Sequence, residues 1–152
     1  EVKEWFDGTV ILSGSIGDGY SVASSLALGA DFAYMGTRFI ATKEANADQG
    51  YKEMLIESAA DDIVYSNLFT GVSGNYLKPS IKNAGLDPNN LPEADKSAMN
   101  FGSGGNTDAK AWKDIWGSGQ GIGGIKDDPS VRDLVERIIE EYNQAKKEFN
   151  DK

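Results

Sequence analysis

The 152-residue sequence contains no cysteine and no histidine. Without cysteine the chain has no disulfide, no thiolate metal site and no cysteine nucleophile. Without histidine it lacks the most frequent general base and the commonest transition-metal ligand. Acid–base chemistry in this chain would therefore depend on carboxylates, lysine or tyrosine. The carboxylates form no strong metal-binding pattern, so we assign no metal site.

Basic residues and long apolar runs are also scarce. The chain has 15 Lys and Arg against 24 Asp and Glu, which gives a formal net charge of −9. An acidic surface repels phosphate backbones and anionic lipid headgroups, so we expect no nucleic-acid or membrane partner. No apolar run approaches the roughly 18 residues that span a bilayer. No basic segment precedes a hydrophobic stretch, as a secretory signal would require, and we expect a cytoplasmic protein.

The first part of the chain has the pattern of a compact β-α-β unit. Residues 9–12 form a β-rich apolar run typical of a strand buried on both faces of a parallel sheet. Residues 14–19 form a glycine-rich turn, and the helical spacing that follows ends at Gly29, a suitable C-cap. Residues 30–35 indicate a second strand. Two parallel strands cannot bury their own sheet, so we expect an α/β fold with further strands.

The rest of the chain is less regular. We expect a helix over 47–59, with Tyr51, Met54, Leu55 and Ser58 on one face, and strands at 63–65 and 68–69. Residues 71–128 look irregular because they hold three of the four prolines and many Gly, Asn and Ser, interrupted by a short helix around 112–116. The clearest element is an amphipathic helix from Val131 to Ala145, for which we predict an Asp127 or Asp128 cap and Pro129 in the first turn.

Two glycine-containing loops follow the two predicted strands. The first covers 13–19 and the second is Gly36-Thr37. The carboxyl ends of parallel strands meet at one sheet edge, so these loops lie side by side, as do the phosphate-binding loops of many barrel enzymes. Glycine lets backbone N–H groups approach an anion, a helix N-terminus adds positive charge, and Ser15 and Thr37 offer hydroxyls. The glycine spacing matches neither the dinucleotide fingerprint nor the Walker motif, and taken alone it is equally typical of a plain turn.

The sequence resembles the nitronate monooxygenase family, FMN enzymes also called 2-nitropropane dioxygenases. The resemblance rests on LSGSIGDG (12–19), ALGAD (27–31) and YMGTRFIAT (34–42), and it continues through Tyr51-Lys52, Phe69-Thr70-Gly71 and WKDIWGSGQG (112–121). It covers nearly the whole chain, and its most specific part is 35–42.

The resemblance implies a fold and a domain organisation. We expect a C-terminal fragment of a TIM (β/α)8 barrel, since a complete barrel takes about 200 residues or more. Residues 1–45 would be the end of the FMN-binding barrel, with strands seven and eight. Residues 46–128 would form a mostly helical and irregular lid-like or substrate subdomain, and 129–152 the C-terminal amphipathic helix.

The resemblance also implies cofactor-binding residues. Gly14 and Ser15 match the positions that hold the FMN phosphate after strand seven, and Gly36 and Thr37 match those after strand eight. Ser15 stands where the family pattern usually has a second glycine. Its backbone N–H can still bind phosphate, but a serine is less suited than glycine to the tightest turn. Gln120 matches a Gly-Gln-Gly segment that approaches the flavin. The family's catalytic histidine and its ring-binding segments come from earlier strands, so we assign no catalytic residue and expect this fragment alone to be inactive.

Several functions are compatible with these features. The first is an FMN-dependent oxidoreductase whose intact form oxidises small nitronates or nitroalkanes with oxygen. A homo-oligomer is compatible with this function. FMN-dependent enoyl-acyl-carrier-protein reductases and inosine-monophosphate dehydrogenases share similar loops, although the Met-Gly-Thr-Arg-Phe run and the Trp-Lys-Asp-Ile-Trp segment favour nitronate monooxygenase. An alternative of another class is a non-catalytic remnant that binds phosphate weakly or only docks onto another chain.

Other side chains have a structural and a functional interpretation. Arg38 could hold a phosphate, but we favour pairing with a carboxylate. Asp18 could contact a ribityl hydroxyl, but we favour a contact that stabilises the turn. For Trp112 and Trp116 we prefer core packing over flavin stacking. The same preference for the core over a substrate pocket applies to Tyr65, Phe69 and Tyr76.

Overall fold

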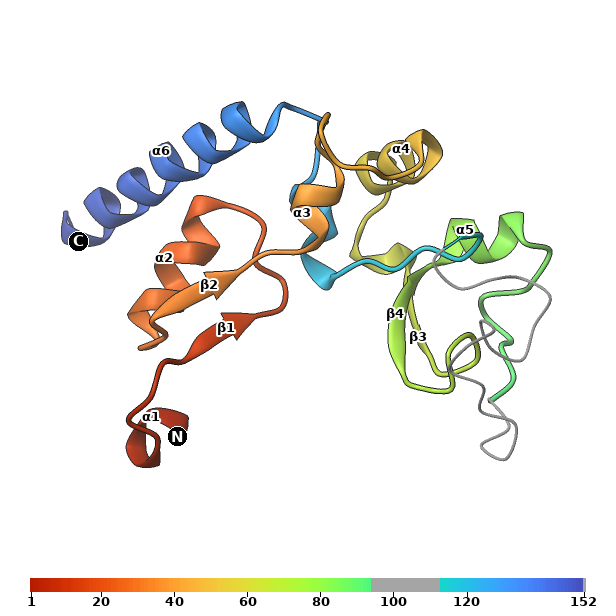
Figure 1. Cartoon of the computed structure of the whole chain (residues 1–152), viewed down its shortest axis with the longest axis horizontal. Helices are drawn as coiled ribbons and strands as arrows, with labels where there is room; N and C mark the ends of the chain where they lie inside the picture. The colour runs from red at the N-terminus through yellow and green to blue at the C-terminus, as the bar shows by residue number, and fades with distance from the viewer. Residues whose placement is uncertain (94–112, 152) are drawn as a thin grey trace. The chain divides into compact units, whose positions relative to one another are not determined.

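The computed structural model describes residues 1–93 and 113–151. The chain divides into two compact units, traced in Figure 1. The first unit comprises Glu1–Ile56 and Gly121–Lys152, and the second comprises Glu57–Gln120. None of the helices in the described ranges is long and apolar enough to cross a bilayer.

The first unit is built on a parallel β-α-β motif. Its elements are α1 (Val2–Trp5), β1 (Ile11–Ser13), α2 (Gly19–Ala27), β2 (Phe32–Tyr34), α3 (Thr37–Ile40), α4 (Gln49–Glu57, of which the last residue lies in the second unit) and α6 (Val131–Asn150). Strands β1 and β2 pair in parallel, with Ile11 opposite Phe32 and Ser13 opposite Tyr34. Gly29 follows α2 with a φ of +94°, as expected for a glycine after a helix. The predicted strand–helix–strand order is confirmed, although β1 begins two residues later than expected.

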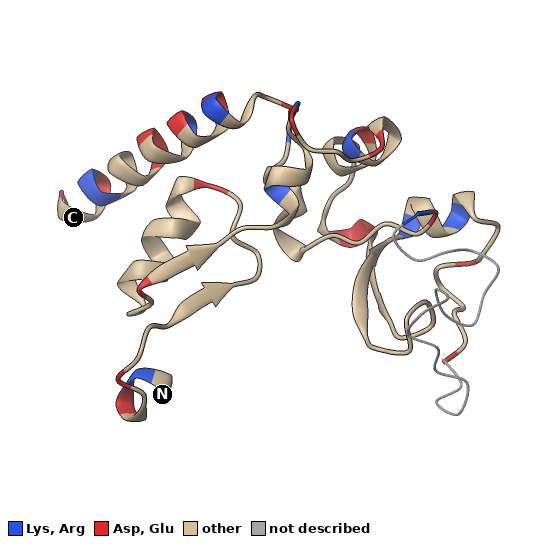
Figure 2. Cartoon of the chain, viewed as in Figure 1, with Lys and Arg blue, Asp and Glu red and all other residues tan. Residues whose placement is uncertain are grey.

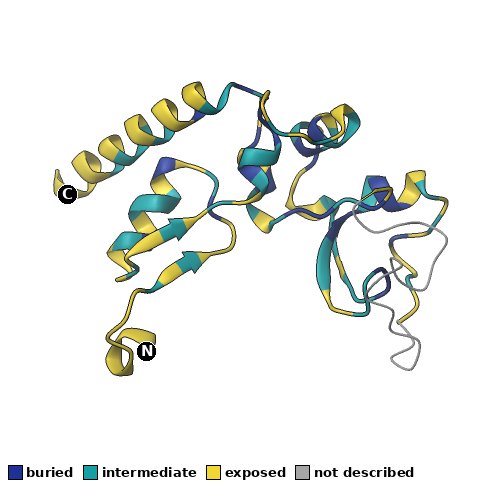
Figure 3. Ribbon diagram, in the orientation of Figure 1, coloured by how far each residue is buried: buried dark blue, intermediate teal, exposed yellow. Residues whose placement is uncertain are grey.

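One face of this two-stranded sheet is exposed. Ile11, Phe32 and Tyr34 are 58, 60 and 63% exposed, whereas Leu12 and Ala33, which point to the other face, are half-buried. Figure 3 shows the alternation along both strands. The prediction of a strand buried on both faces is therefore wrong for one face, because no further layer covers it in the described part of the chain. Helix α2 packs against β2 and covers the other face.

Helices α2 and α6 pack closely at Gly19. A Cβ at this position would collide with the backbone of α6, at Ile138 O and Tyr142 N. The Gly19 N–H also donates to Glu141 Oε2 at 2.8 Å. Charged residues run along the rest of α6, as Figure 2 shows, which agrees with the predicted amphipathic helix. Glu141 is thus a carboxylate of α6 that binds the backbone of α2.

The α6 cap differs from the prediction. Ser130, rather than Asp127 or Asp128, is the N-cap, and its Oγ accepts a 3.1 Å hydrogen bond from the Asp133 N–H. Pro129 therefore precedes the helix instead of lying in its first turn. The Val131 N–H donates to both carboxylate oxygens of Glu44, at 3.0 and 2.9 Å. The physical reason for the error is that the Asp127 carboxylate is engaged by Arg38, 89 residues away, and by Arg137.

The second unit is a small hairpin with a helix. Its elements are the 3-10 turn η1 (Ala60–Asp62), β3 (Ile63–Ser66), β4 (Gly74–Leu77) and α5 (Lys78–Asn83), with η3 (Gln120–Gly124) beginning at its end. The two strands pair antiparallel. Its core consists of Leu68, Phe69, Tyr76, Ile81 and Ile115.

Three predictions for the second unit are wrong. Residues 68–69 lie in the turn between the strands, and 74–83 are a strand and a helix rather than irregular. Residues 115–117 are not helical, because Trp116 O accepts a hydrogen bond from the Leu77 N–H and Gly117 pairs with Tyr76 beside β4. Trp112 lies outside the described residues. These contacts join segments that are far apart in sequence, so the local pattern of apolar and turn residues could not predict them.

Candidate functional site

The parallel register brings the two predicted phosphate loops together. Because Ser13 and Tyr34 are partners at the ends of β1 and β2, Gly14-Ser15 and Gly36-Thr37 leave the sheet at the same edge (Figure 1). The Ser13 hydroxyl lies 3.5 Å from the Tyr34 carbonyl oxygen, a long hydrogen bond across this edge. The structure therefore places four of the five predicted cofactor-binding residues at two adjacent strand ends, with Thr37 as the first residue of α3.

The first loop has an unusual backbone at Ser15. Gly14 has a φ of +101° and Ser15 a φ of +55°, and Ser15 is the one non-glycine residue with positive φ in the described ranges. A left-handed conformation costs an L-residue roughly 1–2 kcal/mol, so the surrounding structure must hold this loop in place. The serine thus keeps the left-handed backbone that a glycine adopts more easily.

Gly121 packs against the strained loop. A Cβ built on Gly121 would lie 3.0 Å from Ser15 O and 3.1 Å from Ser15 Cα, so only glycine fits without displacing the loop. Gly121 belongs to the first unit, and the preceding Gln120 is an exposed residue that belongs to the second. The Gly-Gln-Gly segment therefore reaches the first loop through its last glycine.

Four amides at the start of α2 are already bonded within the protein. The N–H groups of Gly17 and Asp18 both donate to Ser21 Oγ at 3.1 Å, and the Ser21 N–H donates to Asp18 Oδ1 at 2.7 Å. The Gly19 N–H donates to Glu141. This reciprocal cap confirms the interpretation of Asp18 as a turn-stabilising residue. It also means that Gly17, Asp18, Gly19 and Ser21 do not offer free amides to an anion.

The loop residues nearer the strands keep free donors. In the described part of the chain, the backbone N–H groups of Ser15, Ile16 and Gly36 donate to no protein acceptor. Gly36 is exposed, and a Cβ built on it would meet no atom within 4 Å. Unpaired amides on two chain segments that leave the same end of the sheet fit an oxyanion such as phosphate. The donor set therefore suits the phosphate end of a nucleotide-like cofactor.

Arg38 pairs with a carboxylate, as we favoured from the sequence. Its side chain is 3% exposed, and Nη2 lies 2.9 Å from Asp127 Oδ1. Nη1 donates to Ala41 O at 3.2 Å and to Asp127 O at 3.3 Å. Arg137 holds the same carboxylate through two bonds of 3.0 and 2.7 Å. Burial lowers the pKa of Arg38, whereas the hydrogen bonds from Arg137 are the main reason that the pKa of Asp127 lies below its usual value.

Sequence reasoning missed the burial of Lys52. Its side chain is 6% exposed on α4, and Nζ donates to Thr42 O at 2.7 Å. The Thr42 hydroxyl in turn donates to Phe39 O at 2.8 Å. The available signal was the position of Lys52 three residues before the fully buried Leu55, on the same face of the helix.

The aromatic residues of the second unit divide between core and surface. Phe69 and Tyr76 are buried, with ring centroids 4.9 Å apart in an edge-to-face contact, which confirms their interpretation as core. Tyr65 is 71% exposed, so the core interpretation is wrong for this residue. Its side chain alternates with those of the half-buried Val64 and Ser66 along β3 and faces away from the core.

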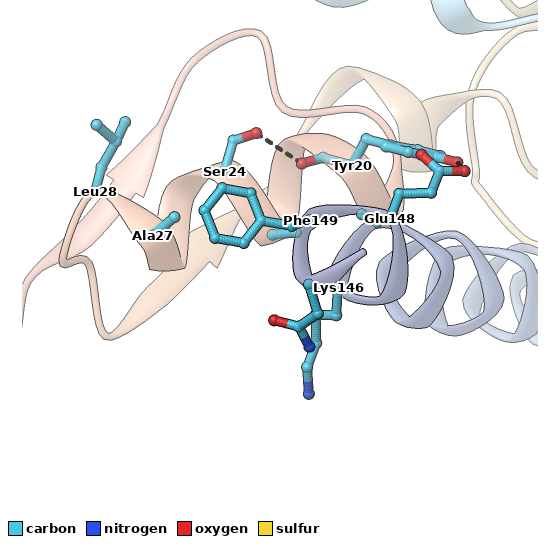
Figure 4. Close-up of a pocket in the computed structure, with 10 residues that line it drawn as sticks. Tyr20, Ser24, Ala27, Leu28, Lys146, Glu148 and Phe149 are labelled. Atoms are coloured by element: carbon cyan, nitrogen blue, oxygen red, sulfur yellow. Dashed lines mark hydrogen bonds between the residues drawn. The ribbon is translucent and has the colours of Figure 1, made fainter. Parts of the chain in front are cut away.

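A separate groove of about 640 Å³ lies between α2 and the end of α6. Figure 4 shows its lining, which includes Tyr20, Leu28 and Phe149. The Tyr20 hydroxyl donates to Glu148 Oε1 at 3.2 Å. None of the predicted cofactor-binding residues lines this groove, so it is distinct from the strand-end loops.

Comparison with known proteins gives consistent results. The family model described as nitronate monooxygenase matches residues 2–141. A nitronate monooxygenase of Paraburkholderia phytofirmans is 37% identical over 79 residues, which cover 52% of this chain and 22% of that protein. A probable nitronate monooxygenase of Staphylococcus saprophyticus is 39% identical over 62 residues, covering 41% of this chain and 18% of that protein.

Solved structures share the fold. FabK from Thermotoga maritima matches with a TM-score of 0.69 and 23% identity, over 98% of this chain and 49% of that one. Nitroalkane oxidase from Streptomyces ansochromogenes matches with a TM-score of 0.67 and 22% identity, over 97% of this chain and 43% of that one. These likenesses support an α/β fold. The chain spans less than half of the solved structures, and the matched part covers about a fifth of the curated relatives.

Proposed function

Because the chain belongs to the nitronate monooxygenase family, we propose that it is the C-terminal part of an FMN-dependent oxidoreductase. In this proposal the intact protein oxidises small nitronates or nitroalkanes with oxygen. This chain supplies the site for the FMN phosphate. The observation that carries the proposal is the pair of adjacent strand ends, where the free amides of Ser15 and Gly36 lie at two of the positions that match the family's phosphate contacts.

Each loop residue has a distinct part in this site. Gly14 and Ser15 turn the chain through left-handed conformations, and the Ser15 N–H is left to bind a phosphate oxygen. Gly36 offers a second N–H beside open space, and Thr37 follows it with a hydroxyl. Gln120 remains a proposed flavin contact, supported by the family pattern. When bound, FMN supplies the electron-transfer chemistry between substrate and oxygen.

The exposed sheet face supports the proposal that this chain is part of a larger barrel. Ile11, Phe32 and Tyr34 present apolar side chains on the face that points away from α2. In a closed barrel, side chains of other strands cover the inner face of every strand. The general base would also come from outside this chain if it is a histidine, because the chain has none.

The competing oxidoreductase is an enoyl-acyl-carrier-protein reductase. The likeness to FabK and to nitroalkane oxidase is nearly equal, so the fold does not choose between them. The family model and the curated relatives favour nitronate oxidation.

The test uses the full-length protein that carries this chain. Its absorption spectrum should show flavin bands as purified or after FMN is added, and the nitronate of 2-nitropropane should make it consume oxygen. Reduction of an enoyl thioester without oxygen consumption would favour the competing reductase. Absence of flavin bands, even after FMN is added, would contradict both flavoenzyme proposals.

A further inference from the structure

Two buried cations bind the backbone a few residues after Gly36-Thr37. Arg38 and Lys52 are 3 and 6% exposed. Arg38 Nη1 donates to Ala41 O at 3.2 Å, and Lys52 Nζ donates to Thr42 O at 2.7 Å. Successive carbonyl groups at the end of α3 are thus each held by a buried positive charge.

Carboxylates balance the charge of Arg38 but not that of Lys52. Asp127 pairs with Arg38 at 2.9 Å, but the same carboxylate is shared with Arg137 at 2.7 Å. Within the described residues, Lys52 has no carboxylate within ion-pair distance. Glu141 also attracts both arginines, and Asp133 attracts Arg137. The buried positive charge that lacks a carboxylate partner among the described residues is therefore that of Lys52.

These cations are close enough to act on a ligand in the loop. Helix α3 has four residues, so it is about 6 Å long, and the Gly36-Thr37 loop begins at its other end. The cations are therefore on the order of 10 Å from a phosphate bound there, which is about one Debye length at physiological salt. Buried charges are screened less than exposed ones, so their attraction for an anion at this distance persists.

We propose that the buried charge of Lys52 is an electrostatic specificity determinant that makes the protein select FMN over riboflavin without touching the phosphate. FMN carries a phosphate where riboflavin carries a neutral hydroxyl, so a positive field at the loop distinguishes the two. The inference rests on the proposed phosphate site. A purely structural role, in which the side chains only hold the carbonyl groups of Ala41 and Thr42, would not produce a preference for FMN over riboflavin.

The test compares the affinities of FMN and riboflavin for the full-length apoprotein by fluorescence titration. Lys52→Met removes the charge and keeps most of the side-chain volume. We expect FMN affinity to fall about five- to tenfold and riboflavin affinity to stay within about twofold. Lys52→Arg should retain the FMN preference. The matched control is Lys43→Met, which removes the same charge from an exposed side chain next to Thr42 and should leave both affinities unchanged.

Other outcomes overturn the inference. A parallel loss of both affinities in Lys52→Met, or an unchanged ratio, assigns Lys52 a structural role only. If Lys52→Met does not fold, Lys52→Gln retains a donor without the charge, and an unchanged FMN preference in that variant contradicts the proposal. A wild-type protein that binds flavin but shows no preference for FMN contradicts the phosphate site itself, and with it this inference.

Discussion

The glycines of the first unit occupy two contrasting settings. At the start of α2, Gly19 is buried against α6, and the amides around it are bonded to side chains. One strand further, Gly36 is exposed, with open space where a side chain would be. Both glycines follow a strand of the same parallel pair, yet the first serves helix packing and the second leaves room for a ligand. A glycine-rich turn at a strand end is therefore not evidence of a binding site until its amides are accounted for.

The strongest test of this contrast is Gly19→Ala. The added methyl would collide with Ile138 O and Tyr142 N, which α6 cannot move without losing its own hydrogen bonds. We expect the free energy of unfolding to fall by about 3 kcal/mol, at the upper end for overpacked sites. Urea denaturation followed by circular dichroism measures it. A loss below about 1 kcal/mol would show that the two helices are not packed as closely as described.

Asp127→Asn tests the ion-pair cluster next to the open loop. The substitution leaves the buried Arg38 without a carboxylate, although its carbonyl contacts remain. We expect a loss of about 2 kcal/mol, less than for a fully buried pair because the Asp127 side chain is 44% exposed. Asp128→Asn removes the neighbouring carboxylate and should change stability little. Equal effects of the two substitutions in thermal unfolding would argue against the cluster.

The same carboxylate predicts a dependence on pH. The pKa of Asp127 is lower in the folded protein than in the unfolded chain, so its stabilising effect is complete above its ordinary pKa of 3.8 and is lost as the pH falls through the lower folded value. Wild type should therefore lose more stability than Asp127→Asn between about pH 5 and pH 2. Parallel pH profiles of the two proteins in urea denaturation would contradict this.

Ser130→Ala should have a smaller effect. The hydroxyl of Ser130 satisfies the Asp133 N–H at the start of α6. Loss of an N-cap side chain costs about 1 kcal/mol. Ser130→Asp restores an acceptor and should recover most of that loss in the same denaturation experiment. No recovery would show that the cap is not the source of the effect.

Gly36→Ala should have the smallest effect on stability. Its φ of −113° is open to any residue, and a methyl would meet no atom within 4 Å, so we expect a change within about 0.5 kcal/mol. FMN affinity should nevertheless fall, because the methyl occupies space proposed for the phosphate. An alanine variant that is strongly destabilised, or that binds FMN as tightly as wild type, would remove the contrast with Gly19.

The sequence was informative where structure depends on neighbouring residues. The β-α-β order, the C-cap glycine and the long final helix follow from local patterns of apolar residues and turns. Ser130 was missed as the α6 cap because Asp127 is held by Arg38, 89 residues away. The amides of α2 were expected to attract an anion because nothing local shows that Glu141, 122 residues from Gly19, already occupies one of them.

The site was predictable to a similar extent. The predicted order of strand, helix and strand in a parallel sheet was enough to expect Gly14-Ser15 beside Gly36-Thr37, and the register confirms that arrangement. The left-handed backbone of Ser15 and the burial of Lys52 could not be predicted, since both depend on tertiary packing. Serine is an unfavourable choice for positive φ, and a lysine in a helix ordinarily faces solvent.

The most direct test of the central claim is a crystal structure of the full-length protein with FMN. The account predicts that phosphate oxygens accept hydrogen bonds from the N–H groups of Ser15 and Gly36, with the Thr37 hydroxyl beside them. It also predicts that the α2 amides stay bonded to Ser21 and Glu141. A phosphate bound away from these two loops, or one that displaces Glu141 from Gly19 to reach α2, would contradict it.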